Sequence, residues 1–247
     1  MKKLEICCGS YYSAQVAQKA GAYRVELCSG LGEGGLTPSL GLVRAVCALD
    51  GLVHHVLIRP RGGDFLYTEA EKRIILDDIA ACIDAGADGV VVGALNADGL
   101  VDLDFLHECV KQADGHAVTF HRAFDLCADP FRALQEIADA GCNRLLTSGQ
   151  ASTAEAGIPV LRRLVQEAPS SLVIMPGCGV NAANAARILS ETGATDIHAS
   201  ARQPLPSRMR FRHQGVSMGK ADADEYATLE TSPESVKAIL EALKSLS

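Results

Sequence analysis

The sequence predicts an α/β fold, a single TIM-type (β/α)8 barrel with a long segment and a final helix after the eighth strand. Short apolar runs alternate with amphipathic stretches, and eight such strand-and-helix units can be counted. Eight units within 247 residues is what one TIM barrel requires. An open, doubly wound sheet is the alternative, but the GxGxxG turn typical of it is missing after the first strand.

Each predicted strand is a short run rich in Val, Ile and Leu that lies between glycines or polar residues. The eight runs are residues 4–8, 24–28, 54–59, 89–93, 117–121, 144–148, 172–176 and 196–200. The stretches between them carry apolar residues three and four positions apart, as in an amphipathic helix. Several helices are predicted to end at a glycine, which suits the left-handed backbone that stops a helix: Gly21, Gly86, Gly141 and Gly193.

The whole chain, 1–247, is predicted to be one domain with a barrel core at 1–200. Residues 201–231 have weak periodicity, and a final helix at 232–246 begins at Ser232 and Pro233. A loop as long as 201–231 usually serves function or assembly in a compact domain. We therefore expect it to be a rim or assembly segment, in a homo-oligomer that is most simply a dimer.

Composition narrows the class of partner. The net charge is -7 and the isoelectric point is about 5.5, so no basic surface is predicted for nucleic acid or an anionic membrane. No apolar run approaches membrane-spanning length, and the N-terminus has no apolar signal region, so we expect a cytoplasmic protein. The nine cysteines lack CxxC spacing, and disulfides are not expected. Small molecules or ions are the expected partners.

Chemically active side chains follow the predicted strand at 117–121 directly. Because a TIM barrel places its active site at the carboxyl ends of its strands, His121, Arg122 and Asp125 are candidate site residues. A buried histidine beside a surface arginine is the plainer interpretation of the same residues. The candidate catalytic residues, most of them candidates for proton transfer, are Glu5, Glu26, Arg59, His121 and Asp125.

The first two strands each carry an acid and, two residues later, a cysteine: Glu5 with Cys7, and Glu26 with Cys28. Residues two apart on a strand share a face, so each pair should point into the barrel. A buried acid needs a partner, and we expect the arginines after the third and fifth strands to supply it. The alternative for the two acids is a structural network of ion pairs in the barrel floor.

The two thiols predict a possible metal site. Adjacent parallel strands lie about 4.8 Å apart, so Cys7 and Cys28 could converge. Soft thiolates select Cu(I) among the common metals. No third ligand and no local spacing motif accompanies them, so a purely structural role stays open.

The loops after the seventh and eighth strands resemble an anion site. Backbone N–H groups in glycine-rich turns and helix N-termini attract phosphate or carboxylate, and many TIM barrels bind phosphate at these two loops. Asn181 is the predicted N-cap of the next helix, while Thr147 and Ser148 add hydroxyl groups from the neighbouring loop. The alternative is that the glycines simply allow a tight turn. The candidate anion-binding residues are Arg61, Gly177, Gly179, Asn181 and Ser200, with Arg202 next to them.

Several blocks of sequence together resemble the CutC family, which is named for copper homeostasis. They are residues 4–7, 24–29, 33–39, 58–65, 119–125 and 146–149, and the likeness extends to about residue 218. The resemblance implies a TIM-type barrel, a cytoplasmic location and a Cu(I) site whose two cysteines match Cys7 and Cys28.

Two functions therefore follow from the sequence. The first is a cytoplasmic Cu(I)-binding protein of copper homeostasis, with Cys7 and Cys28 as ligands. The second is a barrel enzyme acting on a small phosphorylated or carboxylated metabolite, because acids, arginines and a histidine gather at one barrel mouth. A non-catalytic barrel that binds a small ligand is a third interpretation.

Overall fold

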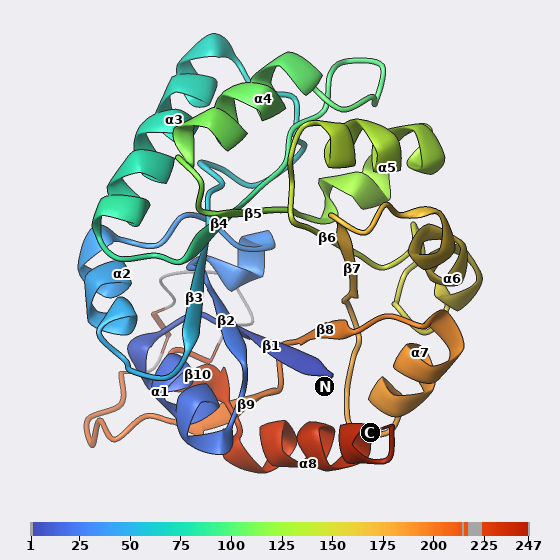
Figure 1. The fold of residues 1–247 in the computed structure, drawn as a ribbon. Helices are drawn as coiled ribbons and strands as arrows, with labels where there is room; N and C mark the ends of the chain where they lie inside the picture. Colours follow the sequence, from blue (N-terminus) through green and yellow to red (C-terminus); the bar gives the residue numbers. More distant parts are fainter. Residues whose placement is uncertain (1, 214, 217–223, 247) are drawn as a thin grey trace.

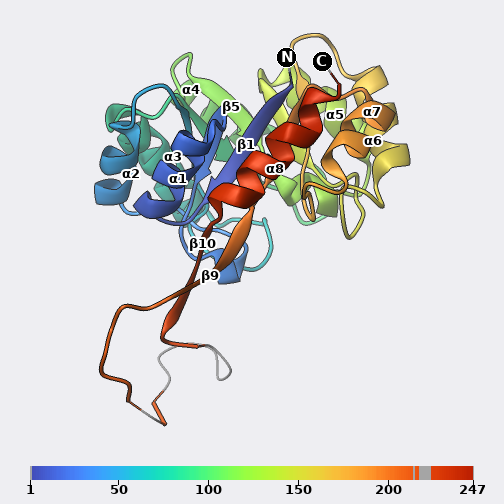
Figure 2. The same cartoon turned by 90° about the horizontal axis from the view of Figure 1, so that it is seen from below.

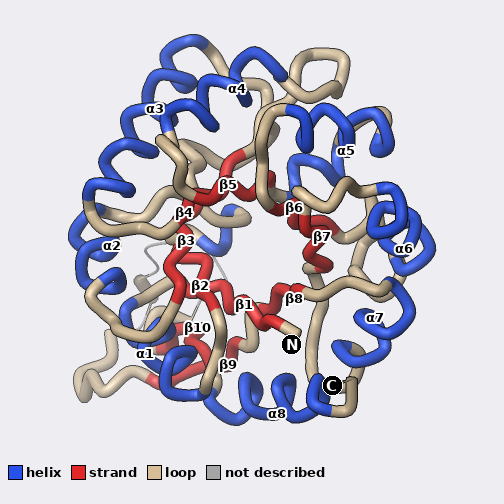
Figure 3. Tube along the Cα trace, in the orientation of Figure 1, coloured by secondary structure: helices blue, strands red, loops and turns tan. Residues whose placement is uncertain are grey.

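The computed structural model describes residues 2–213, 215–216 and 224–246 of the chain. Eight parallel strands form a nearly closed barrel, and helices surround it (Figure 1). Figure 3 shows the strands as the inner ring and the helices as the outer ring. The predicted TIM-type barrel is thus confirmed. The strands are β1 (Lys3–Cys8), β2 (Arg24–Leu27), β3 (Val53–Leu57), β4 (Gly89–Val92), β5 (Ala117–Phe120), β6 (Arg144–Thr147), β7 (Val173–Pro176) and β8 (Asp196–Ala199).

The helices alternate with these strands along the chain. They are α1 (Tyr11–Ala20), α2 (Leu40–Cys47), α3 (Glu69–Asp84), α4 (Leu103–Gln112), α5 (Pro130–Asp139), α6 (Ile158–Glu167), α7 (Ala185–Thr192) and α8 (Pro233–Lys244), with short 3-10 helices η1 (Leu31–Glu33) and η2 (Arg122–Leu126). The glycines predicted to end helices all have left-handed φ angles, between 80° at Gly193 and 102° at Gly86. No helix of the described residues is long and apolar enough to span a membrane.

The strand order is β7-β6-β5-β4-β3-β2-β1-β8, so β7 and β8 are the two ends of the ladder. In the described part of the chain these two strands form no ladder pairing. They still lie side by side, because a Cβ atom built on Gly177 after β7 would lie 3.2 Å from the Cβ of His198 on β8. The barrel therefore has a seam between β7 and β8.

The strands divide their side chains between two faces. On β1, Leu4, Ile6 and Cys8 belong to the large hydrophobic core between strands and helices. Cys7 belongs instead to a small cluster that also includes Cys28. The interiors of TIM barrels are usually filled by Val, Ile and Leu, whereas this interior holds buried charged and polar side chains next to that small cluster.

A two-stranded arm leaves the barrel between β8 and α8. Its strands, β9 (Arg202–Pro206) and β10 (Ala227–Thr231), pair antiparallel. Figure 2 shows the arm extending away from the barrel body. The sequence did not predict these strands, because Pro204 and Pro206 interrupt β9 and prolines count against strand assignment. After the arm, α8 returns between α7 and α1 and completes the outer ring (Figure 1).

Candidate functional site

A cavity of about 540 Å³ opens at the carboxyl ends of the strands. This volume lies within the range of small-molecule sites, roughly 300–1,000 Å³. Its lining includes Cys7, Glu26 and His198 from three adjacent strands, with Arg59 and His121 from later strand ends. The cavity therefore lies where TIM barrels place their active sites.

Cys7 and Cys28 come together as the strand spacing suggests. Their Sγ atoms are 3.4 Å apart, and both side chains are buried. The surrounding cluster is otherwise apolar, and Leu57 and Val91 are its other buried members. The hydrogen bond to Cys28, together with burial, raises the pKa of the Cys7 thiol well above its usual value. The Cys7 thiol is therefore protonated at neutral pH.

His198 adds a third group next to Cys7. Ligand atoms of Cys7, Glu26 and His198 all lie within 4.8 Å of one another. His198 donates through Nδ1 to a carboxylate oxygen of Glu5 at 2.7 Å, while its Nε2 lies 3.9 Å from Glu26. The sequence placed His198 on a barrel strand, but it was not among the candidate ligands or catalytic residues. Its position on β8, two residues after Asp196 and therefore on the same face of the strand, could have indicated that it points into the barrel.

The pKa values of His198 and Glu26 depend on the charges and hydrogen bonds of their neighbours. Burial alone would lower the pKa of His198, but hydrogen bonds to Cys7 and Glu5 and the charge of Glu26 raise it well above its usual value. Burial raises the pKa of Glu26, and the imidazolium of His198 opposes that shift. A cationic histidine beside an acid with a raised pKa is an arrangement suited to proton transfer.

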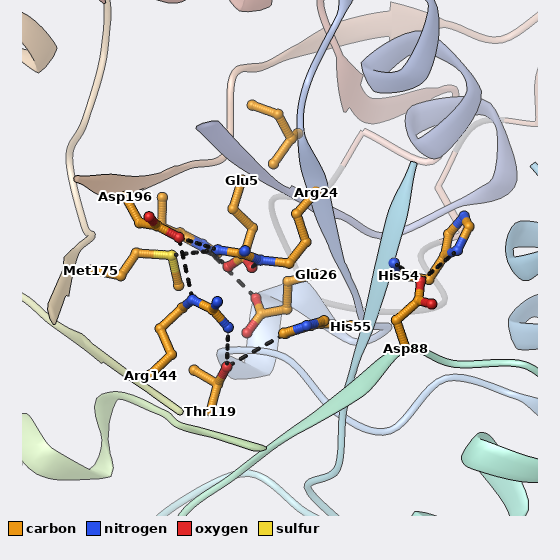
Figure 4. A network of polar contacts seen from close by, with 12 residues as sticks. Glu5, Arg24, Glu26, His54, His55, Asp88, Thr119, Arg144, Met175 and Asp196 are labelled. Atoms are coloured by element: carbon orange, nitrogen blue, oxygen red, sulfur yellow. Dashed lines mark hydrogen bonds and ion pairs between the residues drawn. The ribbon is translucent and has the colours of Figure 1, made fainter. Parts of the chain in front are cut away.

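Glu5 belongs to a buried ion network below the cavity (Figure 4). It pairs with Arg24, which also bonds Asp196 at 3.0 Å, and Arg144 reaches the same Asp196 at 3.3 Å. Burial would raise the pKa of Glu5, but the charges of Arg24 and His198 hold it well below its usual range. Glu5 does not line the cavity.

The expected partners of the two acids were wrong. The cation on Glu5 is Arg24, from the beginning of β2, and not an arginine after the third or fifth strand. The alternative interpretation, a structural ion network in the barrel interior, therefore describes Glu5. Glu26, one layer closer to the mouth, faces the cavity and has His198 as its charged neighbour.

Arg59 and Arg61 lie in different places relative to the cavity. Arg59 lines the cavity, and its two terminal nitrogens donate to the carbonyl oxygens of Glu33, Gly35 and Gly63. Arg61 pairs with Glu71 at 2.5 Å and lies outside the lining of the cavity. The expectation that Arg61 helps bind an anion at the mouth is therefore wrong, because the acid at the start of α3 holds it at the outer rim.

His121 and Asp125 both line the cavity, but their surroundings differ. Burial lowers the pKa of His121 to about 3, and the charge of Arg59 acts in the same direction. Its Nδ1 accepts the backbone N–H of Ala123, so the ring proton lies on Nε2. Asp125 accepts bonds from Thr147, from backbone N–H groups of the following loop and from Arg122 at 2.7 Å. These donors make Asp125 an anchor for the Thr147–Gln150 loop.

The glycine-rich rim is only partly as expected. Gly179 and Ser200 line the cavity, while Gly177 packs against His198 at the seam. Asn181 is not the N-cap of the next helix, because α7 begins at Ala185 with Asn184 at the cap position. Asn181 is exposed and bonds within its own turn, to the carbonyl of Gly179 and the N–H of Ala183.

Comparisons with known proteins show which family the chain resembles. The model of the CutC family matches residues 2–203. The chain is 49% identical to a family protein CutC of Bacteroides thetaiotaomicron, over 99% of this chain and 100% of that one. It is 48% identical to a family protein CutC of Chromobacterium violaceum, with 98% of each chain covered.

A solved structure of the CutC protein from Streptococcus agalactiae has a similar fold. It superposes with a TM-score of 0.76 at 31% identity, covering 80% of this chain and 98% of that chain. The family model and the full-length relatives lead to the same assignment: the chain belongs to the CutC family.

Proposed function

We propose that the protein binds Cu(I) through Cys7 and Cys28 and takes part in copper homeostasis. The observation that carries this proposal is the pair of thiols 3.4 Å apart in a buried, mainly apolar cluster that reaches the cavity. Thiolates are soft ligands and select Cu(I). The family name and the Streptococcus agalactiae relative, which is named for copper homeostasis, point the same way.

The donor set fits a soft monovalent ion. Two thiols supply the soft ligands, and the imidazole of His198 is within reach of Cys7 as a third donor. Because the pKa of Cys7 is raised and metal ligands must be deprotonated, binding should release protons and strengthen as the pH rises. A cytoplasmic location is part of the proposal, since thiols stay reduced there.

The first test is stoichiometry. The reduced protein should bind about one Cu(I) per chain, measured by competition with a Cu(I)-specific chelator, because one pair of soft ligands is available at the cavity. The Cys7→Ser, Cys28→Ser double variant should lose this binding, since hydroxyl groups are hard ligands. Cys178→Ser is the matched control: Cys178 also lines the cavity but lies outside the pair, and its loss should leave binding unchanged. Stoichiometric binding by the double variant would contradict the proposal.

A second candidate function is catalysis on a small anionic metabolite. The observation that favours it is the pairing of Glu26 with His198 on the wall of a cavity large enough for an organic ligand. In this function His198 donates a proton and Glu26 exchanges one with solvent or substrate. Turnover lost in Glu26→Gln but kept in Cys28→Ser would separate this function from copper binding.

A further inference from the structure

We propose that the loop at residues 178–180, together with Arg202, binds the phosphate group of a small organic molecule held in the cavity. This inference deepens the second candidate function. Phosphate binding can nevertheless be measured without any reaction, so the two can fail separately.

The loop presents free backbone donors. Among the described residues, the N–H groups of Cys178, Gly179 and Val180 have no hydrogen-bond acceptor, and all three residues line the cavity. Cys178 and Gly179 have left-handed φ angles of 87° and 71°. Their carbonyl groups are occupied elsewhere, Cys178 by the N–H of Ala154 and Gly179 by side-chain amides. Consecutive free N–H groups in a turn form an anion-binding concavity.

The side chains on the same cavity add positive charge. Arg202 lines the cavity at the start of β9 and forms no ion pair with any described residue. Arg122 is paired with Asp125, and that carboxylate is already saturated by donors from the neighbouring loop. Arg59 also lines the cavity and Glu26 is the other acid of the lining, so positive charge is in excess there although the chain as a whole carries -7.

Two buried donors on this cavity also lack a partner. They are Nε2 of His121 and Nε of Arg59, whose side chains are 5% and 6% exposed. The proton of His121 lies on Nε2, because Nδ1 accepts a backbone hydrogen bond. A buried donor without an acceptor is costly, and native proteins rarely keep one without a reason. A polar ligand in the cavity supplies acceptors for both groups.

The size of the cavity decides the class of ligand. At about 540 Å³ it is far larger than a phosphate ion and falls in the range of small organic ligands. The phosphate group would lie at Arg202 and residues 178–180, and the organic part would reach toward Glu26 and His198. This placement brings the reactive end of the ligand to the acid–imidazole pair.

Isothermal titration with inorganic phosphate tests the site on the full chain. Binding should be saturable at fixed ionic strength, and Arg202→Ala should weaken it at least tenfold. Arg210→Ala is the matched control, an exposed arginine of the arm that does not line the cavity, and it should bind phosphate like the unaltered protein.

Equal affinities for Arg202→Ala and Arg210→Ala would overturn the proposal, as would a response that chloride reproduces at the same ionic strength. Acetate binding as tightly as phosphate would replace the phosphate group with a carboxylate and so overturn the assigned chemistry.

Discussion

Replacing Arg24 by alanine should lower the free energy of unfolding by about 3–5 kcal/mol, the usual cost of removing one partner from a buried ion pair. Arg24 is 1% exposed and bonds both Glu5 and Asp196. Its loss leaves Glu5 with His198, and Asp196 with Arg144, as the charged partners among the described residues. Urea unfolding at neutral pH measures the effect.

Two further variants give this prediction its control. Arg132→Ala removes an exposed i,i+4 pair with Glu136 and should hardly change stability, because such surface pairs contribute little. Adding Glu5→Gln to Arg24→Ala should recover part of the loss, since the buried carboxylate charge is then gone. An Arg24→Ala protein as stable as the unaltered chain would show that water or neighbouring groups compensate the network.

Stability should also fall steeply on mild acidification. Burial lowers the pKa of both His55 and His121 to about 3, from an ordinary value of 6.5. Between these values the unfolded chain binds protons that the folded chain does not, so stability is lost as the pH falls. Each histidine contributes about 1.4 kcal/mol per pH unit in this window. Below about pH 4.5 Glu5 acts in the same direction, because its folded pKa is lowered.

Unfolding free energies at about pH 5.5 and 4.5 would show this dependence as a drop of about 2.7 kcal/mol over that unit from the two histidines together. His121→Gln should halve the slope. His107→Gln, which alters an exposed histidine on α4, should leave it unchanged. A slope that is the same in all three proteins would place the acid sensitivity elsewhere.

The barrel could be predicted from the sequence because its signals are local. Apolar runs, helical periodicity and glycine stops each depend on a few adjacent residues. The approach of Cys7 to Cys28 followed from the same reasoning, since parity and strand spacing are properties of any parallel sheet. The family resemblance was needed only to name Cu(I) as the ion that the two cysteines are expected to bind.

The residues that were missed depend on the register and stagger of the barrel. Arg24 stands directly opposite Glu5 in the β1–β2 ladder, and His198 stands opposite Glu5 on the other side. Neither pairing can be read from a single strand, because register is fixed only when all eight strands close. The prediction that Arg61 binds an anion was wrong for another reason: Glu71, in the capping box of α3, pairs with Arg61 locally.

The seam between β7 and β8 gives the buried network a mechanical role. Arg144 on β6 reaches Asp196 on β8 across the gap where the ladder has no backbone hydrogen bonds, while Arg24 on β2 reaches the same carboxylate from the hydrogen-bonded side. At this point the barrel is held closed by an ion pair between side chains, Arg144 with Asp196. Its strength depends on protonation in a way that an amide ladder does not. Amide hydrogen exchange along β8 should therefore report the charge state of the barrel interior.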